Sequence, residues 1–200
     1  HGGVRPNVQL TSPDLYLNIH IAGDSITISL DSSGESLHKR GYRVANTQAP
    51  INEALAAGML LLAGWKGQSD FYDPMCGSGT LLIGAALIAH NIAPGIYRKG
   101  FAFEKWANFD ADLFEDVSSD DSRERDFNHK IYGSDAGFYA VQAAIKNVKS
   151  AGLQRDIEVR QIRIQEIKLA EKNTEGALIM INPPYGERLA QDKDVLRLYQ

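Results

Sequence analysis

The chain has 200 residues, a net charge of -4, and hydrophobic and charged fractions of 44% and 23%, a composition typical of a globular protein with room for one domain and part of a second. It has no basic excess of the kind that binds nucleic acid through charge alone, and no apolar run of the roughly 20 residues that a membrane-spanning helix needs. Its single cysteine, Cys76, excludes an internal disulfide framework and a cysteine-based zinc cluster, so we expect a reduced, cytoplasmic protein without a metal or membrane contact.

The first 46 residues predict a β-hairpin followed by a basic stretch. Apolar and polar residues alternate over 15–21 and again over 25–30, which is typical of half-buried strands joined by a short turn. The basic side chains that follow are His38, Lys39, Arg40 and Arg43. They could contact phosphates, but by composition alone a solvated loop is the commoner explanation of such a cluster.

From residue 47 onward, helices alternate with strands. We expect helices at 47–65, 80–91 and 137–151, and strands at 71–72, 130–135, 157–162 and 177–181. This order predicts an α/β fold with a doubly wound, mainly parallel sheet. Residues 96–128 contain a group of aromatic residues and an acidic stretch. We interpret them as an insertion packed on the sheet, since packing is commoner for such aromatics than stacking on bases.

A glycine-rich loop, Asp73-Pro-Met-Cys-Gly-Ser-Gly-Thr80, lies between the first strand of that sheet and the next helix. It lacks the GK[ST] ending that binds triphosphates, and Leu82 stands where the dinucleotide fingerprint needs its third glycine. An acid before the glycines would also repel a pyrophosphate. A cofactor with an ammonium, a sulfonium and a ribose fits better, and S-adenosylmethionine is such a molecule.

The residues of this loop suggest separate roles. Gly77 and Gly79 allow the backbone to approach a ligand closely, and Asp73 can accept hydrogen bonds from an amino group. Asp135, at the end of the next strand, can accept both ribose hydroxyls or can cap the following helix. Cys76 lies within the loop, so we do not interpret it as a nucleophile.

The tetrapeptide Asn182-Pro183-Pro184-Tyr185 follows the last predicted strand. The Asn182 side-chain oxygen and the Pro183 carbonyl can accept both N–H groups of an exocyclic amine and so direct its lone pair at a methyl donor. The prolines fix an extended backbone, and Tyr185 can stack on a base that has been flipped out of its helix. A simple turn after a strand is the structural alternative.

The segments DPMCGSGTLLI, INPPYGERL and SLDSSGESLHKRGYR resemble the bacterial THUMP-domain class I RNA methyltransferases. The resemblance is strongest to those that methylate the guanine amino group (N2) of 23S ribosomal RNA and to their relatives that are often labelled N6-adenine-specific DNA methylases. The resemblance implies the end of a THUMP RNA-binding domain and a linker over 1–46, and a truncated methyltransferase domain with a Rossmann-like fold over 47–200. It implies ribosomal RNA as the partner, and for the basic stretch it favours RNA contact over a solvated loop. The cofactor residues implied are Asp73, Pro74, Met75, Cys76, Gly77, Gly79, Thr80, Asp135 and Gln165. The residues implied at the amine are Asn182, Pro183, Pro184 and Tyr185.

One position departs from the family, and several functions remain open. Relatives often have an acid near the cofactor adenine where this chain has Arg163, so we expect Gln165 or Glu166 to substitute. An adenine-N6 methyltransferase acting on DNA or RNA would use the same tetrapeptide. A binding fragment without activity is a third interpretation, and Leu82 argues against a nicotinamide dehydrogenase. The sequence does not indicate an oligomeric state.

Overall fold

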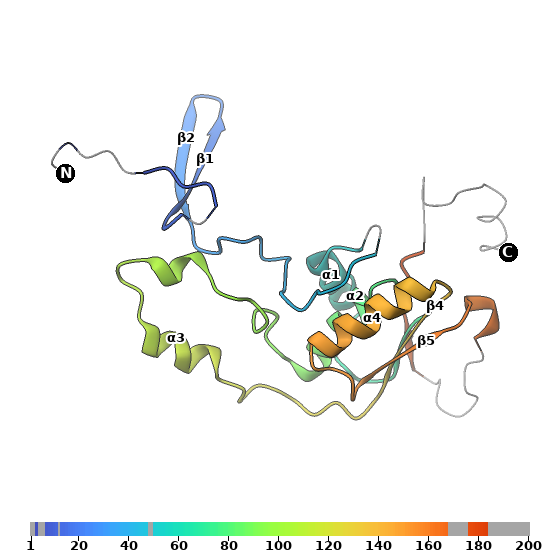
Figure 1. Ribbon diagram of the computed structural model, residues 1–200. Helices are drawn as coiled ribbons and strands as arrows, with labels where there is room; N and C mark the ends of the chain where they lie inside the picture. The colour runs from blue at the N-terminus through green and yellow to red at the C-terminus, as the bar shows by residue number, and fades with distance from the viewer. Residues whose placement is uncertain (1–2, 4–6, 12, 48–49, 168–175, 184–200) are drawn as a thin grey trace. The chain divides into compact units, whose positions relative to one another are not determined.

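The computed structural model describes residues 3, 7–11, 13–47, 50–167 and 176–183. Two compact units are present, the first formed by residues 1–41 and 93–123 and the second by residues 42–92 and 124–200. The elements in chain order are β1 (Tyr16–Ala22), β2 (Ser25–Asp31), α1 (Glu53–Leu62), β3 (Phe71–Asp73), α2 (Thr80–His90), η1 (Ala102–Lys105), α3 (Ala111–Ser118), β4 (Ile131–Asp135), α4 (Phe138–Ser150), β5 (Ile157–Gln161), η2 (Ile164–Glu166) and β6 (Leu178–Ile179) (Figure 1). None of the helices found in these residues is long and apolar enough to cross a membrane.

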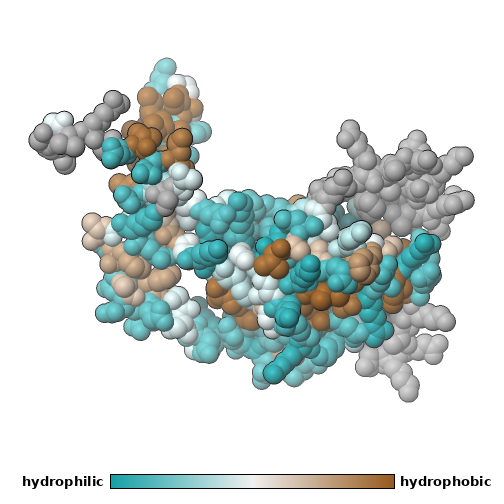
Figure 2. All heavy atoms as spheres, in the orientation of Figure 1, coloured by the Kyte–Doolittle hydropathy of each residue, from teal (hydrophilic) through white to brown (hydrophobic). Residues whose placement is uncertain are grey.

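The first unit contains the predicted hairpin. Strands β1 and β2 pair in antiparallel register from Tyr16 opposite Asp31 to Ala22 opposite Ser25, and Gly23 turns the chain with a φ of 58°. Alternation puts six aliphatic side chains on one face of the hairpin. They are Leu17, Ile19, Ile21, Ile26, Ile28 and Leu30, each at least half exposed, and they form a hydrophobic patch in the space-filling view (Figure 2).

Residues 93–123 belong to this first unit, so the predicted packing of the 96–128 insertion on the sheet is wrong for most of that segment. The aromatic rings of Phe101, Phe103, Phe109 and Phe114 pack on one another, with centroid separations between 5.2 and 6.3 Å. The Arg98 guanidinium donates hydrogen bonds to four backbone carbonyls between residues 33 and 39. The segment therefore forms its own small core beside the chain that follows the hairpin.

The second unit has the predicted parallel sheet, with strand order β5-β4-β3-β6. The chain starts at β3, steps outward through β4 to β5, and then returns to the other side of β3 with β6. The strand order therefore reverses next to β3. In open α/β sheets, ligands bind at the carboxyl ends of the strands at such a reversal.

Alternation along the strands gives the sheet two different faces. Phe71, Ile131 and Ile157 are aligned in register on one face and are buried, and helices α2 and α4 pack against these strands. A Cβ atom on Gly133 would overlap Leu82 Cδ1 of α2, so a larger residue here would force the buried Leu82 side chain to move. The opposite face displays Tyr72, Tyr132 and Glu158, which occupy the alternate positions.

Helix α1 is shorter than the predicted helix over 47–65. It begins after Asn52, whose side-chain oxygen accepts hydrogen bonds from the N–H groups of Ala54 and Leu55 at 2.9 and 3.1 Å. A good N-cap residue ends the extended linker there, so Pro50 precedes the helix and does not lie in its first turn. The helix ends at Leu62, before Gly64 adopts a φ of 74°.

Candidate active site

Asp73 ends β3 and is almost fully buried. Its Oδ1 atom accepts a hydrogen bond from the Met75 N–H at 3.1 Å. Burial is the main cause that raises the pKa of Asp73 from 3.8 to about 7; the Met75 N–H opposes this rise, and the nearby Asp135 charge adds to it. A buried carboxyl with so little compensation is suited to a cationic or hydrogen-bond-donating ligand.

Asp135 ends β4 and connects the glycine loop to helix α4. Its Oδ2 atom accepts from the Gly77 N–H at 3.0 Å, and its Oδ1 atom accepts from the Gly137 N–H at 2.8 Å. The N-cap of α4 is Gly137, so the interpretation of Asp135 as the cap is wrong. Each carboxylate oxygen has a second lone pair, and the side chain is only partly buried, so Asp135 can still accept from ribose hydroxyls.

The two glycines of the loop differ in what surrounds them. Both have positive φ angles, 55° at Gly77 and 84° at Gly79. A Cβ atom on Gly77 would meet nothing within 4 Å, whereas one on Gly79 would lie 3.3 Å from the Cβ atom of Ala144 in α4. Gly77 therefore borders open space that a ligand could occupy, and Gly79 allows α2 to begin close against α4.

The other residues of the loop divide into inward and outward positions. Cys76 is buried, and its N–H donates to the Ser134 carbonyl at 2.8 Å, which attaches the loop to β4. Burial raises the pKa of the Cys76 thiol, consistent with the expectation that it is not a nucleophile. Thr80 is also buried, and its hydroxyl accepts from Arg43; its predicted contact with the cofactor stays a prediction. Pro74 and Met75 are half-buried.

Arg43 differs most from its predicted role. Its guanidinium donates to Glu53 Oε1 at 2.8 Å and to the hydroxyls of Ser78 and Thr80 at 2.9 Å each. The side chains of Arg43 and Glu53 are 14% and 10% exposed. The predicted RNA contact of Arg43 is therefore corrected, because its charge and donors are used inside the second unit.

The remaining predicted RNA-contacting residues lie in the first unit. Lys39 is exposed and forms a surface ion pair with Glu35 at 3.0 Å. Ser36 Oγ and His38 Nδ1 lie 2.8 Å apart, and Arg40 is partly buried. Such an exposed pair contributes little stability, so the Lys39 side chain is available for a partner. Contact of Lys39, His38 and Arg40 with RNA stays a prediction.

Asn182 and Pro183 follow β6, the strand beside β3. The Met180 N–H donates to the Tyr72 carbonyl at 3.0 Å, so the chain is still paired with β3 just before Asn182. Both residues are half-buried and lie at the carboxyl end of the sheet, on the far side of β3 from Asp135. Pro184 and Tyr185 lie outside the described residues.

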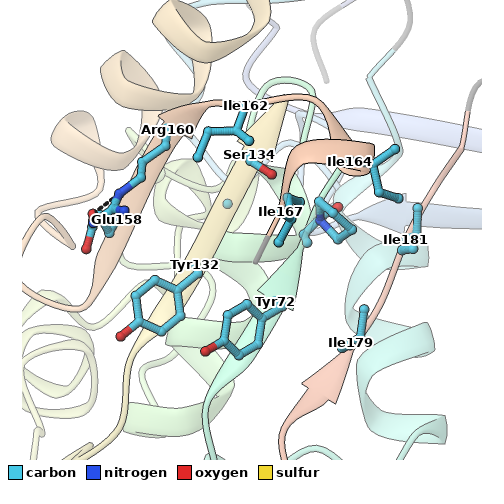
Figure 3. Close-up of a pocket in the computed structure, with 13 residues that line it drawn as sticks. Tyr72, Tyr132, Ser134, Glu158, Arg160, Ile162, Ile164, Ile167, Ile179 and Ile181 are labelled. Atoms are coloured by element: carbon cyan, nitrogen blue, oxygen red, sulfur yellow. Dashed lines mark hydrogen bonds and ion pairs between the residues drawn. The ribbon is translucent and has the colours of Figure 1, made fainter. Parts of the chain in front are cut away.

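A cavity of about 530 Å³ opens on the sheet face that α2 and α4 leave uncovered (Figure 3). The Tyr72 and Tyr132 rings stack at a centroid distance of 4.9 Å along its floor. Arg160 and Glu158 pair at one side, with Ile162 near Arg160, and Ile164, Ile167, Ile179 and Ile181 line the other.

The contact of Gln165 with the cofactor stays a prediction. Both Gln165 and Arg163 are exposed, and neither lines the cavity, whereas Ile162 and Ile164 do. Sequence reasoning also missed Tyr72 and Tyr132. The signal that could have found them is the strand alternation, which places them opposite the buried Phe71 and Ile131.

Among the residues that the structure describes, no group of three or more His, Cys, Asp or Glu side chains is arranged to hold a metal ion. The polar groups at the carboxyl edge are instead two carboxylates, loop N–H groups and the amide of Asn182. This set suits hydroxyl and amine groups on a ligand.

The parallel sheet with its reversal beside β3 defines the chain as an α/β protein with the Rossmann-like fold of class I methyltransferases. The chain belongs to the family described as "RMKL-like, methyltransferase domain", which matches residues 40–200. It is 42% identical, over its full length, to the ribosomal RNA large subunit methyltransferase K/L of Saccharophagus degradans, of which it covers 28%.

Two solved structures are also similar. One is SMU.472, described as a methyltransferase and complexed with SAH, with 40% identity and a TM-score of 0.83 over 94% of this chain and 49% of that one. The other is a Listeria monocytogenes protein described as a predicted N6-adenine-specific DNA methylase, with 38% identity and a TM-score of 0.83 over 92% of this chain and 48% of that one. The chain thus spans less than half the length of these relatives.

Proposed function

We propose that this chain is the catalytic part of an S-adenosylmethionine-dependent methyltransferase that modifies an exocyclic amine of a base in large-subunit ribosomal RNA, most specifically guanine N2. The observation that carries the proposal is the convergence of Asp73, Asp135 and Asn182 at one edge of the sheet, on both sides of the strand reversal. The family match and the name of the Saccharophagus relative support the same class of activity.

The residues fit S-adenosylmethionine in three respects. The buried Asp73 carboxyl can accept from its ammonium group, and Asp135 can accept from its ribose hydroxyls. The open space beside Gly77 leaves room for the ligand against the loop backbone. The SMU.472 structure, complexed with SAH, supports this assignment.

The protein's contribution to the reaction is to position the amine. S-adenosylmethionine, when bound, supplies an electrophilic methyl group. Asn182 Oδ1 and the Pro183 carbonyl accept the two N–H groups of the amine, which directs the nitrogen lone pair at the methyl carbon. The nitrogen would take up that methyl group, and its surplus proton would leave to solvent. Orientation of this kind can supply a large part of a rate enhancement.

An adenine N6 amine is the second candidate, because Asn182 and Pro183 would accept its N–H groups in the same way. The description of the Listeria protein favours this alternative. The hairpin of the first unit and the basic stretch at 38–40 favour RNA as the substrate, because both are predicted to be related to a THUMP domain. The assignment of residues 1–46 to that domain and of 47–200 to the methyltransferase domain is part of this proposal.

Nucleoside analysis tests the proposal directly. Full-length protein is incubated with labelled S-adenosylmethionine and ribosomal RNA that lacks the modification, and the RNA is then digested to nucleosides. Label in N2-methylguanosine supports the proposal, whereas label in N6-methyladenosine supports the alternative. Titration calorimetry with S-adenosylhomocysteine and with NAD provides the control, since binding of NAD alone would contradict a methyltransferase.

A further inference from the structure

The glycine loop is held in shape by residues outside it. Ser78 stands between Gly77 and Gly79, neither of which has a side chain that could anchor the loop. The Ser78 hydroxyl accepts from Arg43 Nη1 at 2.9 Å, and the Ser78 carbonyl accepts from Asn147 Nδ2 at 3.0 Å. Both the hydroxyl and the carbonyl of Ser78 are therefore bound by side chains that come from distant parts of the chain.

Asn147 binds the linker as well as the loop. It is completely buried in α4, its Oδ1 atom accepts from the N–H groups of Val44 and Ala45 at 2.9 Å each, and its Nδ2 atom also donates to the Ala45 carbonyl at 2.8 Å. All the hydrogen-bonding capacity of this amide is thus used between the linker and Ser78. The linker lies fixed next to the glycine loop.

Arg43 adds the charged half of this connection. Glu53, the first residue of α1, neutralises the guanidinium, and Thr80, the first residue of α2, accepts from Nη2. A planar guanidinium can hold several acceptors in a fixed geometry that a lysine ammonium cannot reproduce. Arg43 therefore joins the start of both helices to the loop that lies between β3 and α2.

We propose that Arg43 is a positioning residue for the cofactor loop, and that its main role is to hold Ser78 and Thr80, with Asn147, so that Gly77 keeps its open side toward the ligand. This inference rests on the proposed function, because it takes S-adenosylmethionine to bind at the loop. Arg43 stands three residues after Arg40, so the linker connects the predicted RNA-contacting stretch directly to the cofactor loop.

The test compares Arg43→Met and Arg43→Lys with two matched controls in the full-length protein. Lys66→Met removes a positive charge from an exposed side chain of the same unit. Asn52→Ala removes the N-cap of α1 without touching Ser78 or Thr80, so it reports what a general loss of stability does. The measurements are the dissociation constant for S-adenosylhomocysteine, the melting temperature, and hydrogen exchange of the amides from residue 76 to 80.

Arg43→Met is expected to weaken S-adenosylhomocysteine binding by about tenfold and to speed exchange of the loop amides, because an unanchored loop must be ordered on binding. Arg43→Lys should recover part of the affinity, and both control variants should bind within about twofold of the wild type. Wild-type affinity in Arg43→Met, or an equal loss in Asn52→Ala at a matched melting temperature, would overturn the inference.

The experiment distinguishes a failure of the proposed function from a failure of the anchoring role of Arg43. If the wild-type protein does not bind S-adenosylhomocysteine, the proposed function is contradicted. Hydrogen exchange of the loop amides in Arg43→Met then tests the anchoring role by itself. Faster exchange than in Asn52→Ala supports that role, and unchanged exchange refutes it.

Discussion

The most specific prediction concerns Asp73, because protonation of its carboxyl group should affect both folding and ligand binding. The folded-state pKa is raised from 3.8 to about 7, so the native protein holds a proton that the unfolded chain releases. The stabilisation from this proton is complete below pH 3.8 and is lost as the pH rises through 7. At one pKa unit per roughly 1.4 kcal/mol, the group costs the native state up to about 4 kcal/mol above neutral pH.

Substitution of Asp73 by Asn should remove this cost while keeping the oxygen that accepts from Met75. The variant should therefore be more stable than the wild type at pH 8, by up to about 4 kcal/mol, and should lack the decline in stability between pH 5 and 7. Urea denaturation at several pH values measures both effects. Asp116→Asn, which changes an exposed carboxyl in α3, is the control and should follow the wild type. A wild-type stability that does not fall over this range would refute the reasoning.

Ligand binding should be linked to proton release, whereas folding is linked to proton uptake. An ammonium group beside Asp73 favours the carboxylate and lowers its pKa, so binding should release a proton near pH 6. The affinity for S-adenosylhomocysteine should then fall about tenfold per pH unit below 7. Calorimetry in buffers of different ionisation enthalpy measures the released proton. Proton release of the same size in Asp73→Asn would assign it to another group.

Three further predictions follow from the site and its packing. Asn182→Ala should abolish methyl transfer but leave S-adenosylhomocysteine binding within about threefold, since it removes an acceptor for the amine alone; retained turnover would contradict that role. Gly133→Ala should cost about 1–3 kcal/mol in urea denaturation, because the new methyl group overlaps the fully buried Leu82; unchanged stability would show that α2 can shift. Gly79→Ala should destabilise the protein more than Gly77→Ala, because only Gly79 packs against α4; equal losses would mean that positive φ alone sets the cost.

The order of elements could be predicted from the sequence because it depends on short-range patterns. Alternation located β1 and β2, and the strand–loop–helix order around Asp73 predicted a parallel sheet with its loops at one edge, which the strand pairing confirms. Helix α1 was predicted too long because helical periodicity does not locate an end. The Asn52 cap does.

The same short-range patterns located the candidate loops but not the roles of their residues. Nothing in the sequence separated Gly77 from Gly79, or showed that the Thr80 hydroxyl faces inward. The burial that raises the pKa of Asp73 depends on helices and strands packed around it, and is therefore a tertiary property.

The amino-acid sequence by itself determined the fold class, the loop beside β3 and the amide beside β6, because each depends on residues adjacent in the chain. Only the tertiary structure decided what Arg43 does. Its partners Ser78 and Thr80 lie 35 and 37 residues away, and a basic residue in a basic stretch is equally compatible with a solvated surface, a phosphate contact or an internal anchor. Folding brings the acceptors to the guanidinium, and those contacts distinguish the three.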